Sequence, residues 1–344
     1  MEKKEWKSVA TGVGTLFVLL LLVFLVFRSH LCEIIENIRS VPIVGLAFLL
    51  TLGIVYQLLD GAICFVLVRD QLPSFPFGQA LTVTFLGVFG NVSTLSVGSI
   101  PMQSYYLHRC GLMAGSGVGV LALKYVFHKC SVLIYTTIML LAQGRWLGIT
   151  SSELFRHMAL GYAICTLVIV ALILLCSWKK ILQLALWIIH QLPNIEKWEQ
   201  HKQLWSANLE ALYTESQKIL RNRSCLLKMI VLNVLKLFCL YSIPFLCFRM
   251  LNISVLSFWR VHLLAALMYL ITNALPNVAG MGPTEFAFIL IFSYYLEYAQ
   301  AMSALILFRI ATFFFPFILS LIVFLNVQKH ILNDDRQVNK ADTL

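Results

Sequence analysis

Charged side chains are scarce in this sequence. Of its 344 residues only 12% are Asp, Glu, Lys or Arg, whereas 60% are hydrophobic, and the mean hydropathy is +0.84. Soluble globular proteins carry about twice that share of charge, so these values exclude an ordinary soluble protein. The apolar residues form stretches long enough to cross a bilayer, and none alternates polar and apolar residues as membrane-barrel strands do. The sequence therefore predicts an all-α, polytopic membrane protein.

Motifs of soluble enzymes are also missing. The chain has no Walker loop, no G-x-G-x-x-G after a strand and no H-E-x-x-H pair, and its nine cysteines show neither C-x-x-C nor zinc-binding spacing. His128 has Cys130 and Ser131 nearby in sequence, but no orienting acid is evident, so a core histidine is the stronger interpretation. We expect no cofactor and no bound metal.

Six stretches have the length and composition of complete membrane spans: 9–27, 42–68, 113–142, 158–177, 225–250 and 302–327. About 20 helical residues at 1.5 Å each cross a hydrocarbon core of roughly 30 Å. The first stretch follows three lysines and lacks a small-x-small cleavage site, so we interpret it as a retained helix and not a signal peptide. We predict one transmembrane domain over 1–328 and a short tail over 329–344.

Two further apolar segments, 79–110 and 258–299, contain helix breakers. Three residue types recur in them at a separation of 182 positions: Asn91, Gly98 and Pro101 in the first, Asn273, Gly280 and Pro283 in the second. A helix that is interrupted at membrane depth exposes backbone groups that lipid cannot satisfy. Paired interruptions in two halves of a membrane protein are typical of an inverted repeat around a transport site. Two unrelated kinks are the alternative.

Charge bias predicts the orientation of the chain. The net charge of +10 is concentrated in connecting segments, especially between Lys179 and Lys228, which indicates cytoplasmic loops that face anionic lipid and not a nucleic-acid site. The segment 178–224 is cytoplasmic only if 79–110 enters and leaves the membrane on the same face. We therefore expect two re-entrant hairpins that approach the midplane from opposite faces, with both termini in the cytoplasm.

The segment 178–224 is the only sizeable region outside the predicted bilayer. Its apolar residues repeat at helical spacing, at Trp198, Trp205, Leu209, Leu212 and Ile219. Helices that lie on the inner leaflet and a helical linker that packs on the bundle are both open interpretations. We expect that it is too short to hold a soluble catalytic domain.

Ionisable residues inside the spans mark the candidate site, because each costs roughly 2.5–3.5 kcal/mol to insert. Lys124, His128 and Lys129 lie near the centre of the third complete span, and Lys124 and His128 share one helix face. The two lysines need a carboxylate from elsewhere, water, or a bound anion such as phosphate. Anion binding and structural ion pairing both stay open.

The acidic residues suggest partners. Glu285 follows the second break, where it either stabilises the start of a helix or pairs with Lys124 or Arg309. Asp60 is near Arg69 and the inner interface, so an ordinary ion pair there and a functional role inside the membrane both stay open.

The breaks themselves add polar groups. Backbone N–H groups around the glycines suit an anion, and asparagine side chains both donate and accept hydrogen bonds. The predicted lipid-headgroup site comprises Lys124, His128, Lys129, Glu285, Asn91, Asn273, Gly98, Gly280, Gly282 and Arg309.

Two passages carry a resemblance to a known family. They are Gly90-Asn91, Gly98, Pro101 and Tyr105-Tyr106-Leu107-His108-Arg109-Cys110-Gly111, and then Leu275-Pro276-Asn277-Val278-Ala279-Gly280-Met281-Gly282-Pro283-Thr284-Glu285. They resemble the signature segments of the lysylphosphatidylglycerol synthase transmembrane family, a flippase-like group of bacterial and archaeal membrane proteins. Many members have Pro-Gly-Gly where this chain has Val278-Ala279-Gly280. The chain nevertheless retains Gly280, Gly282 and Glu285 of the family pattern.

The resemblance implies a role in lipid translocation. In the bifunctional members, this membrane module accompanies a soluble aminoacyl-transferase domain and is linked to moving aminoacylated phosphatidylglycerol outward, which resists cationic peptides. We expect no such domain here, and hence a translocase for a phospholipid or lipid-linked phosphate in a bacterial plasma membrane. The alternatives are a phosphatidylglycerol lysyltransferase-type enzyme and an accessory partner of another membrane enzyme.

Overall fold

The computed structural model describes residues 31–94, 96–150, 152–191, 196–272 and 280–341. These residues are helical and include no strand, as the sequence predicts. In chain order the helices are α2 (Leu31–Arg39), α3 (Ile43–Arg69), α4 (Phe77–Ser93), α5 (Ser99–Arg109), α6 (Ala114–Thr150), α7 (Ser152–Ser177), α8 (Lys179–His190), α9 (Glu196–Arg221), α10 (Arg223–Met250), α11 (Phe258–Thr272), α12 (Pro283–Phe292), α13 (Tyr298–Arg309), the π-helix η2 (Ile310–Phe314) and α14 (Phe315–Ala341).

Five of the helical stretches are long and apolar enough to cross a membrane: Ile43–Arg69, Gly115–Gly148, Ala159–Ser177, Arg223–Met250 and Tyr298–His330. They confirm five of the six predicted spans, whereas the predicted span 9–27 lies outside the described residues. The third predicted span is longer than expected, because α6 continues to Thr150. The protein is therefore a multi-pass helical membrane protein.

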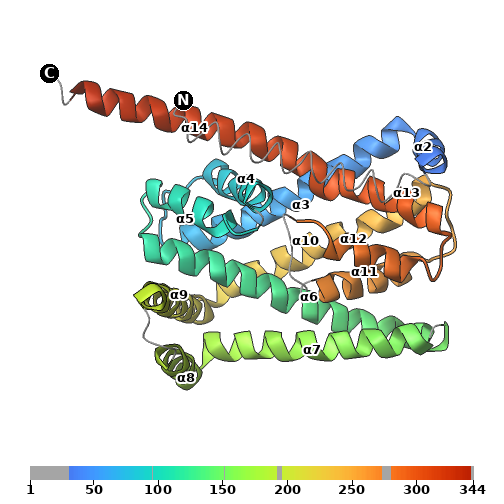
Figure 1. Ribbon diagram of the computed structural model, residues 1–344, viewed down its shortest axis with the longest axis horizontal. Coiled ribbons are helices and arrows are strands. Elements are labelled where there is room, and N and C mark those ends of the chain that lie inside the picture. Colours follow the sequence, from blue (N-terminus) through green and yellow to red (C-terminus); the bar gives the residue numbers. More distant parts are fainter. Residues whose placement is uncertain (1–30, 95, 151, 192–195, 273–279, 342–344) are drawn as a thin grey trace.

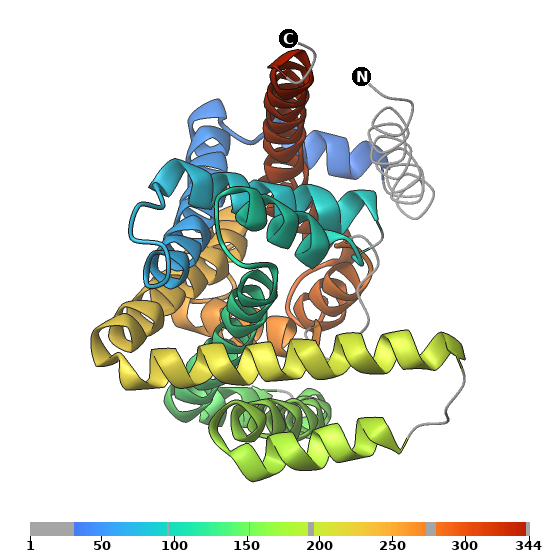
Figure 2. The ribbon, with the colours of Figure 1, turned by 90° about the vertical axis from the view of Figure 1, so that its left-hand side faces the viewer.

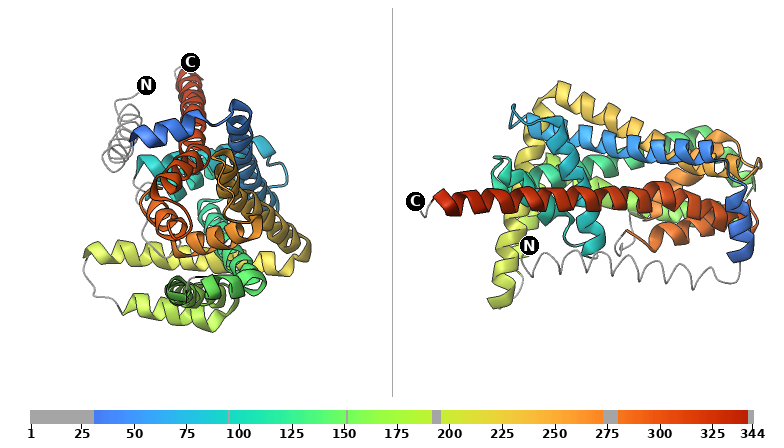
Figure 3. Two further views of the ribbon diagram at one scale, coloured as in Figure 1. Left: turned by 90° about the vertical axis from the view of Figure 1, so that its right-hand side faces the viewer. Right: turned by 90° about the horizontal axis from the view of Figure 1, so that it is seen from above.

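The spans run side by side along the longest axis of the molecule (Figure 1). Helices α8 and α9 cross one end of the bundle (Figure 2), and the short α2 crosses the other (Figure 3). Close helix approaches rely on small residues, as is common in membrane bundles. A methyl group on Gly61 of α3, for example, would touch the Leu81 side chain of α4.

Both helix interruptions occur where the sequence predicts them. Helix α4 ends at Ser93 and α5 begins at Ser99, and α11 ends at Thr272 before α12 begins at Pro283. Residues 273–279, which include Asn273, lie outside the described part of the chain. The α4–α5 pair lies towards the end that carries α8 and α9, and the α11–α12 pair lies towards the end that carries α2 (Figures 1 and 3). Membrane re-entry and the inverted repeat stay predictions.

Helix α9 packs on the bundle through its second half. Leu212 and Ile219 are buried, whereas Trp205 is exposed. At Gly119 of α6 the helices approach so closely that a methyl group would lie 2.8 Å from the carbonyl oxygen of Ala211. This half therefore has the character of a packed linker.

Helix α8 differs from α9. Its apolar side chains Leu184, Trp187 and Ile188 are each about half exposed, and its first turn carries Lys179 and Lys180. An exposed apolar face with basic residues beside it is typical of a helix on a membrane surface. Each of the two interpretations of 178–224 thus fits a different helix.

The contact at Gly119 gives a test of α9 docking. We expect Gly119→Leu to push α9 away from α6, because overpacking costs about 1–3 kcal/mol. Hydrogen exchange measured by mass spectrometry should then accelerate in 196–221. Gly115→Leu is the matched control, since a methyl group there meets no atom within 4 Å. Equal exchange in both variants would contradict the docking.

Candidate functional site

One carboxylate and two ammonium groups form an ion triad inside the bundle. Asp60 of α3 contacts Lys124 Nζ of α6 at 2.5 Å and Lys236 Nζ of α10 at 3.0 Å. The side chains of Asp60, Lys124 and Lys236 are 19%, 12% and 2% exposed. Because two lysines share one carboxylate, the ion triad has a formal charge of +1.

The ion triad lies inside the spans but not at the centre of each. Lys236 is near the centre of α10, Asp60 precedes the end of α3 by nine residues, and Lys124 follows the start of α6 by ten residues and precedes its end by 26. At 1.5 Å per residue, Asp60 and Lys124 are roughly 14–15 Å from the nearer ends of their helices. Charges at that depth are costly and usually serve a partner or a pathway.

The interpretation of Asp60 as a partner of Arg69 is wrong. Nine residues are two and a half helical turns, so these two side chains leave α3 on opposite sides. Asp60 instead reaches the two lysines, and the Arg69 guanidinium lies 5.1 Å from the ring centroid of Phe65.

His128 and Lys129 lie differently with respect to the ion triad. His128 is one turn beyond Lys124, within electrostatic range of Asp60 and Lys236, and its buried Nδ1 has no hydrogen-bond partner among the described residues. Lys129 Nζ lies 4.7 Å from the ring centroid of Tyr125. Of the three predicted residues on α6, Lys124 therefore belongs to the ion triad, His128 lies one turn beyond it, and Lys129 packs on an aromatic ring.

A second ion pair stabilises the break between α11 and α12. Arg309 Nη2 of α13 lies 2.5 Å from Glu285 Oε1. The other carboxylate oxygen, Oε2, accepts a hydrogen bond of 2.6 Å from the N–H of Gly282, and Arg309 also donates to the carbonyl oxygen of Gly280. Glu285 thus both caps α12 and pairs with Arg309, not with Lys124.

The two interruptions meet at Gly280. Gly280 has a φ of +85° and Gly282 has a φ of +100°, and residues with a Cβ atom rarely adopt such backbone conformations. A methyl group on Gly280 would lie 3.1 Å from Nδ2 of Asn91, in the last turn of α4 before the first interruption, and 2.7 Å from the ring of Phe313. The glycine therefore permits the close approach of two segments that are far apart in sequence.

Gly98 is already engaged within the first interruption. Its N–H donates to Thr94 Oγ1 at 2.5 Å, and Thr94 Oγ1 donates to the carbonyl oxygen of Gly90 at 2.6 Å. An anion at this N–H would have to displace the threonine hydroxyl.

Two tyrosines lie near the charged residues. Lys236 Nζ is 5.8 Å from the ring centroid of Tyr56. The ring of Tyr269 packs on Tyr241 of α10 and on Phe308 of α13, at centroid distances of 5.6 Å and 6.4 Å.

Asp60, Lys236 and the two tyrosines are absent from the predicted headgroup site. Asp60 and Lys236 are detectable as charges within spans, but the sequence does not reveal that they pair with each other or that Lys124 shares the same carboxylate. The tyrosines carry no signal, because aromatic residues are common throughout this chain.

A π-helical turn follows Arg309 directly. It covers Ile310–Phe314, and the carbonyl oxygen of Ala311 packs so closely on Gly53 of α3 that a methyl group there would clash. Single π-turns within α-helices are frequent at functional sites. Here the turn adjoins the residue that contacts both Glu285 and Gly280.

Four cavities in the described part of the chain lie away from these charges. They are lined by residues of α6, α7 and α11, of α8 and α9, of α6, α7 and α9, and of α3 and α10 with the residues before it. None of the four is lined by Asp60, Lys124, Lys236, Glu285 or Arg309. The charges thus lie outside these four cavities, and most of each charged side chain is covered by protein.

The ion triad makes a prediction about stability. We expect Asp60→Asn to lower the melting temperature by several degrees, because two buried lysines lose their carboxylate, at a cost of about 3–5 kcal/mol. Fluorescence-detected unfolding in detergent measures this change. Adding Lys124→Met to Asp60→Asn should restore part of the loss. Asp70→Asn, at an exposed position, is the control; a similar loss in that variant would contradict a special role for Asp60.

Comparison with known proteins supports the sequence resemblance. The model of one family, described as the lysylphosphatidylglycerol synthase TM region, matches residues 11–320. A search of the curated proteins found no match to the chain. The match covers both helix interruptions, the ion triad and the Glu285–Arg309 pair. Because it spans most of the sequence, the chain belongs to the lysylphosphatidylglycerol synthase transmembrane family, whose members are membrane proteins related to lipid modification or translocation.

Proposed function

We propose that this protein moves a phospholipid or a lipid-linked phosphate across the membrane. The observation that carries the proposal is the ion triad, which places an excess positive charge in the middle of the bundle. A lipid phosphate carries the complementary charge and accepts charge-assisted hydrogen bonds from lysines. The acyl chains can stay in the bilayer while the headgroup passes through the protein.

The Glu285–Arg309 pair supports a substrate that also carries an amino group. An ammonium group competes with Arg309 for the Glu285 carboxylate, while the phosphate binds near Lys124. Aminoacylated phosphatidylglycerol has both groups in one headgroup, and the family includes proteins of its synthesis. Delivery of this lipid to the outer leaflet makes the surface less negative, which weakens the binding of cationic peptides.

The packing of the charges supports a mechanism with two states. Since the ion pairs are packed in the core, the headgroup enters only when α3, α6 and α10 separate around Asp60. The α4–α5 and α11–α12 pairs, which meet at Gly280 and Asn91, are the elements expected to move against each other. Alternate opening towards the two ends of the bundle would expose the charges first to one leaflet and then to the other.

The charge distribution supports one orientation. The end that carries α8 and α9 is rich in lysine and arginine, so it faces the cytoplasm under the positive-inside rule. The end with α2 then faces outward, and the protein acts in a bacterial plasma membrane.

Lys124→Met tests the proposed role of the excess charge. It leaves a neutral Asp60–Lys236 pair, so we expect the protein to fold but to move lipid about tenfold more slowly or less, which corresponds to about 1.4 kcal/mol or more. Transbilayer movement of a fluorescent phosphatidylglycerol in proteoliposomes is the measurement.

The control for this variant is Lys228→Met, which removes an exposed lysine. Lipid movement that is unchanged by Lys124→Met, in protein with a normal melting temperature, would contradict the proposal. The appearance of a new lipid species on thin-layer chromatography would instead indicate a transferase.

Glu285→Gln tests the recognition of the amino group. The amide oxygen can still cap α12, but the negative charge is lost, so we expect the preference for lysylphosphatidylglycerol over phosphatidylglycerol to fall about fivefold or more. Competition between the two lipids in the same proteoliposome assay measures this preference. Glu297→Gln, at an exposed position, should retain it. An unaltered preference in Glu285→Gln would exclude the carboxylate from substrate recognition.

A further inference from the structure

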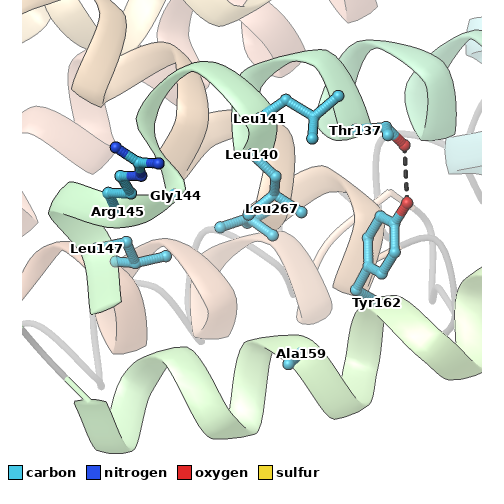
Figure 4. Close-up of a pocket in the computed structure, with 9 residues that line it drawn as sticks. All are labelled: Thr137, Leu140, Leu141, Gly144, Arg145, Leu147, Ala159, Tyr162 and Leu267. Atoms are coloured by element: carbon cyan, nitrogen blue, oxygen red, sulfur yellow. Dashed lines mark hydrogen bonds between the residues drawn. The ribbon is translucent and has the colours of Figure 1, made fainter. Parts of the chain in front are cut away.

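A groove between α6, α7 and α11 lies apart from the charges of the central site (Figure 4). Its volume is about 600 Å³, and leucines from α6 and α11 line most of it. Arg145 lies at one end, and the Thr137–Tyr162 hydrogen bond lies at the other (Figure 4). We propose that this groove binds one anionic phospholipid, with its phosphodiester at Arg145 and an acyl chain along the leucines.

The groove is built as a surface that faces lipid. Leu141 on its rim is 84% exposed, whereas Leu267 of α11 at its base is 1% exposed. In a membrane the exposed face of α6 and α7 meets acyl chains, so a lipid is the molecule available to fill an apolar groove here. The groove opens along a candidate span, which excludes a water-soluble ligand as its natural occupant.

Arg145 gives the groove a preference for negatively charged lipids. It lies three residues before the end of the candidate span Gly115–Gly148, which is the depth of a lipid headgroup. It is exposed and has no acidic partner within the described residues. A guanidinium group binds a phosphodiester through two parallel hydrogen bonds. Phosphatidylcholine has the same phosphodiester, but its trimethylammonium group cancels the net charge of the lipid and repels Arg145, so a lipid with net negative charge is favoured.

The length of the groove confines the lipid to one leaflet. Thr137 and Arg145 are eight residues apart, or roughly 12 Å along α6, which is less than half of the hydrocarbon core. The inner end is closed, since Thr137 Oγ1 donates to the carbonyl oxygen of Leu133 at 2.7 Å and lies 2.7 Å from the Tyr162 hydroxyl. This bound lipid is therefore held in place, and the site is separate from the proposed translocation path.

The groove is also distant from the ion triad along α6. Lys124 precedes Thr137 by 13 residues, roughly 20 Å along α6. The inference consequently holds whether or not the central charges move lipid.

Native mass spectrometry of the full-length protein tests the inference. Delipidated protein is titrated with phosphatidylglycerol or with phosphatidylcholine of the same acyl chains. We expect one phosphatidylglycerol to bind at least about fivefold more tightly than phosphatidylcholine, and Arg145→Gln to abolish this preference. Arg249→Gln removes an exposed arginine at the end of α10 and should leave the preference intact.

A second variant tests the groove without altering charge. Gly144 lines the groove, and a methyl group there meets no atom within 4 Å, so Gly144→Leu should fill the space without disturbing the fold. We expect it to weaken the binding of both lipids, whereas Gly115→Leu at the other end of α6 should not.

Two results with the arginine variants, and a third with Gly144→Leu, would overturn the inference. One is a phosphatidylglycerol preference that survives Arg145→Gln, and the other is an equal loss of that preference in Arg249→Gln. Undiminished lipid binding in Gly144→Leu would likewise exclude the groove as the binding place.

Discussion

Two lysines share one carboxylate in the interior of a membrane bundle, and much of the structure depends on that imbalance. Asp60 connects α3, α6 and α10 through charge-assisted contacts with Lys124 and Lys236. Loss of the carboxylate would leave two uncompensated charges in a region of low dielectric constant, where they are costly. The remaining positive charge attracts anions, so the same three residues that stabilise the core also define what it can bind.

The helix interruptions solve a related problem with backbone groups. Lipid offers no hydrogen bonds, so the freed carbonyl and N–H groups need partners within the protein. Glu285 accepts a hydrogen bond from the N–H of Gly282, and Arg309 donates one to the carbonyl oxygen of Gly280. In the first interruption, Thr94 Oγ1 accepts a hydrogen bond from the N–H of Gly98. The partners of the second interruption are charged, which makes them available to a charged headgroup when the helices move.

The charged centre of the bundle and its apolar periphery differ in structure. The centre holds opposite charges on separate helices, in a packed state that must open before a headgroup can enter. The periphery offers fixed surfaces: the exposed apolar face of α8 at one end, and the groove with Arg145 towards the other.

The sequence by itself determined the class of protein, the positions of the spans and the places where two helices break. These features depend on local chemistry: the length of apolar stretches, and the inability of Gly280 and Pro283 to continue a helix. It also indicated that Glu285 would cap a helix, since capping is a contact over three residues. It did not determine the charge partners. Asp60, Lys124 and Lys236 lie on three helices, and only the rotation and packing of those helices turn their side chains towards one another, whereas the sequence neighbour Arg69 points away. The meeting of Asn91 with Gly280 and the groove at Arg145 were decided by tertiary structure for the same reason, because each joins segments whose separation along the chain says nothing about their distance in space.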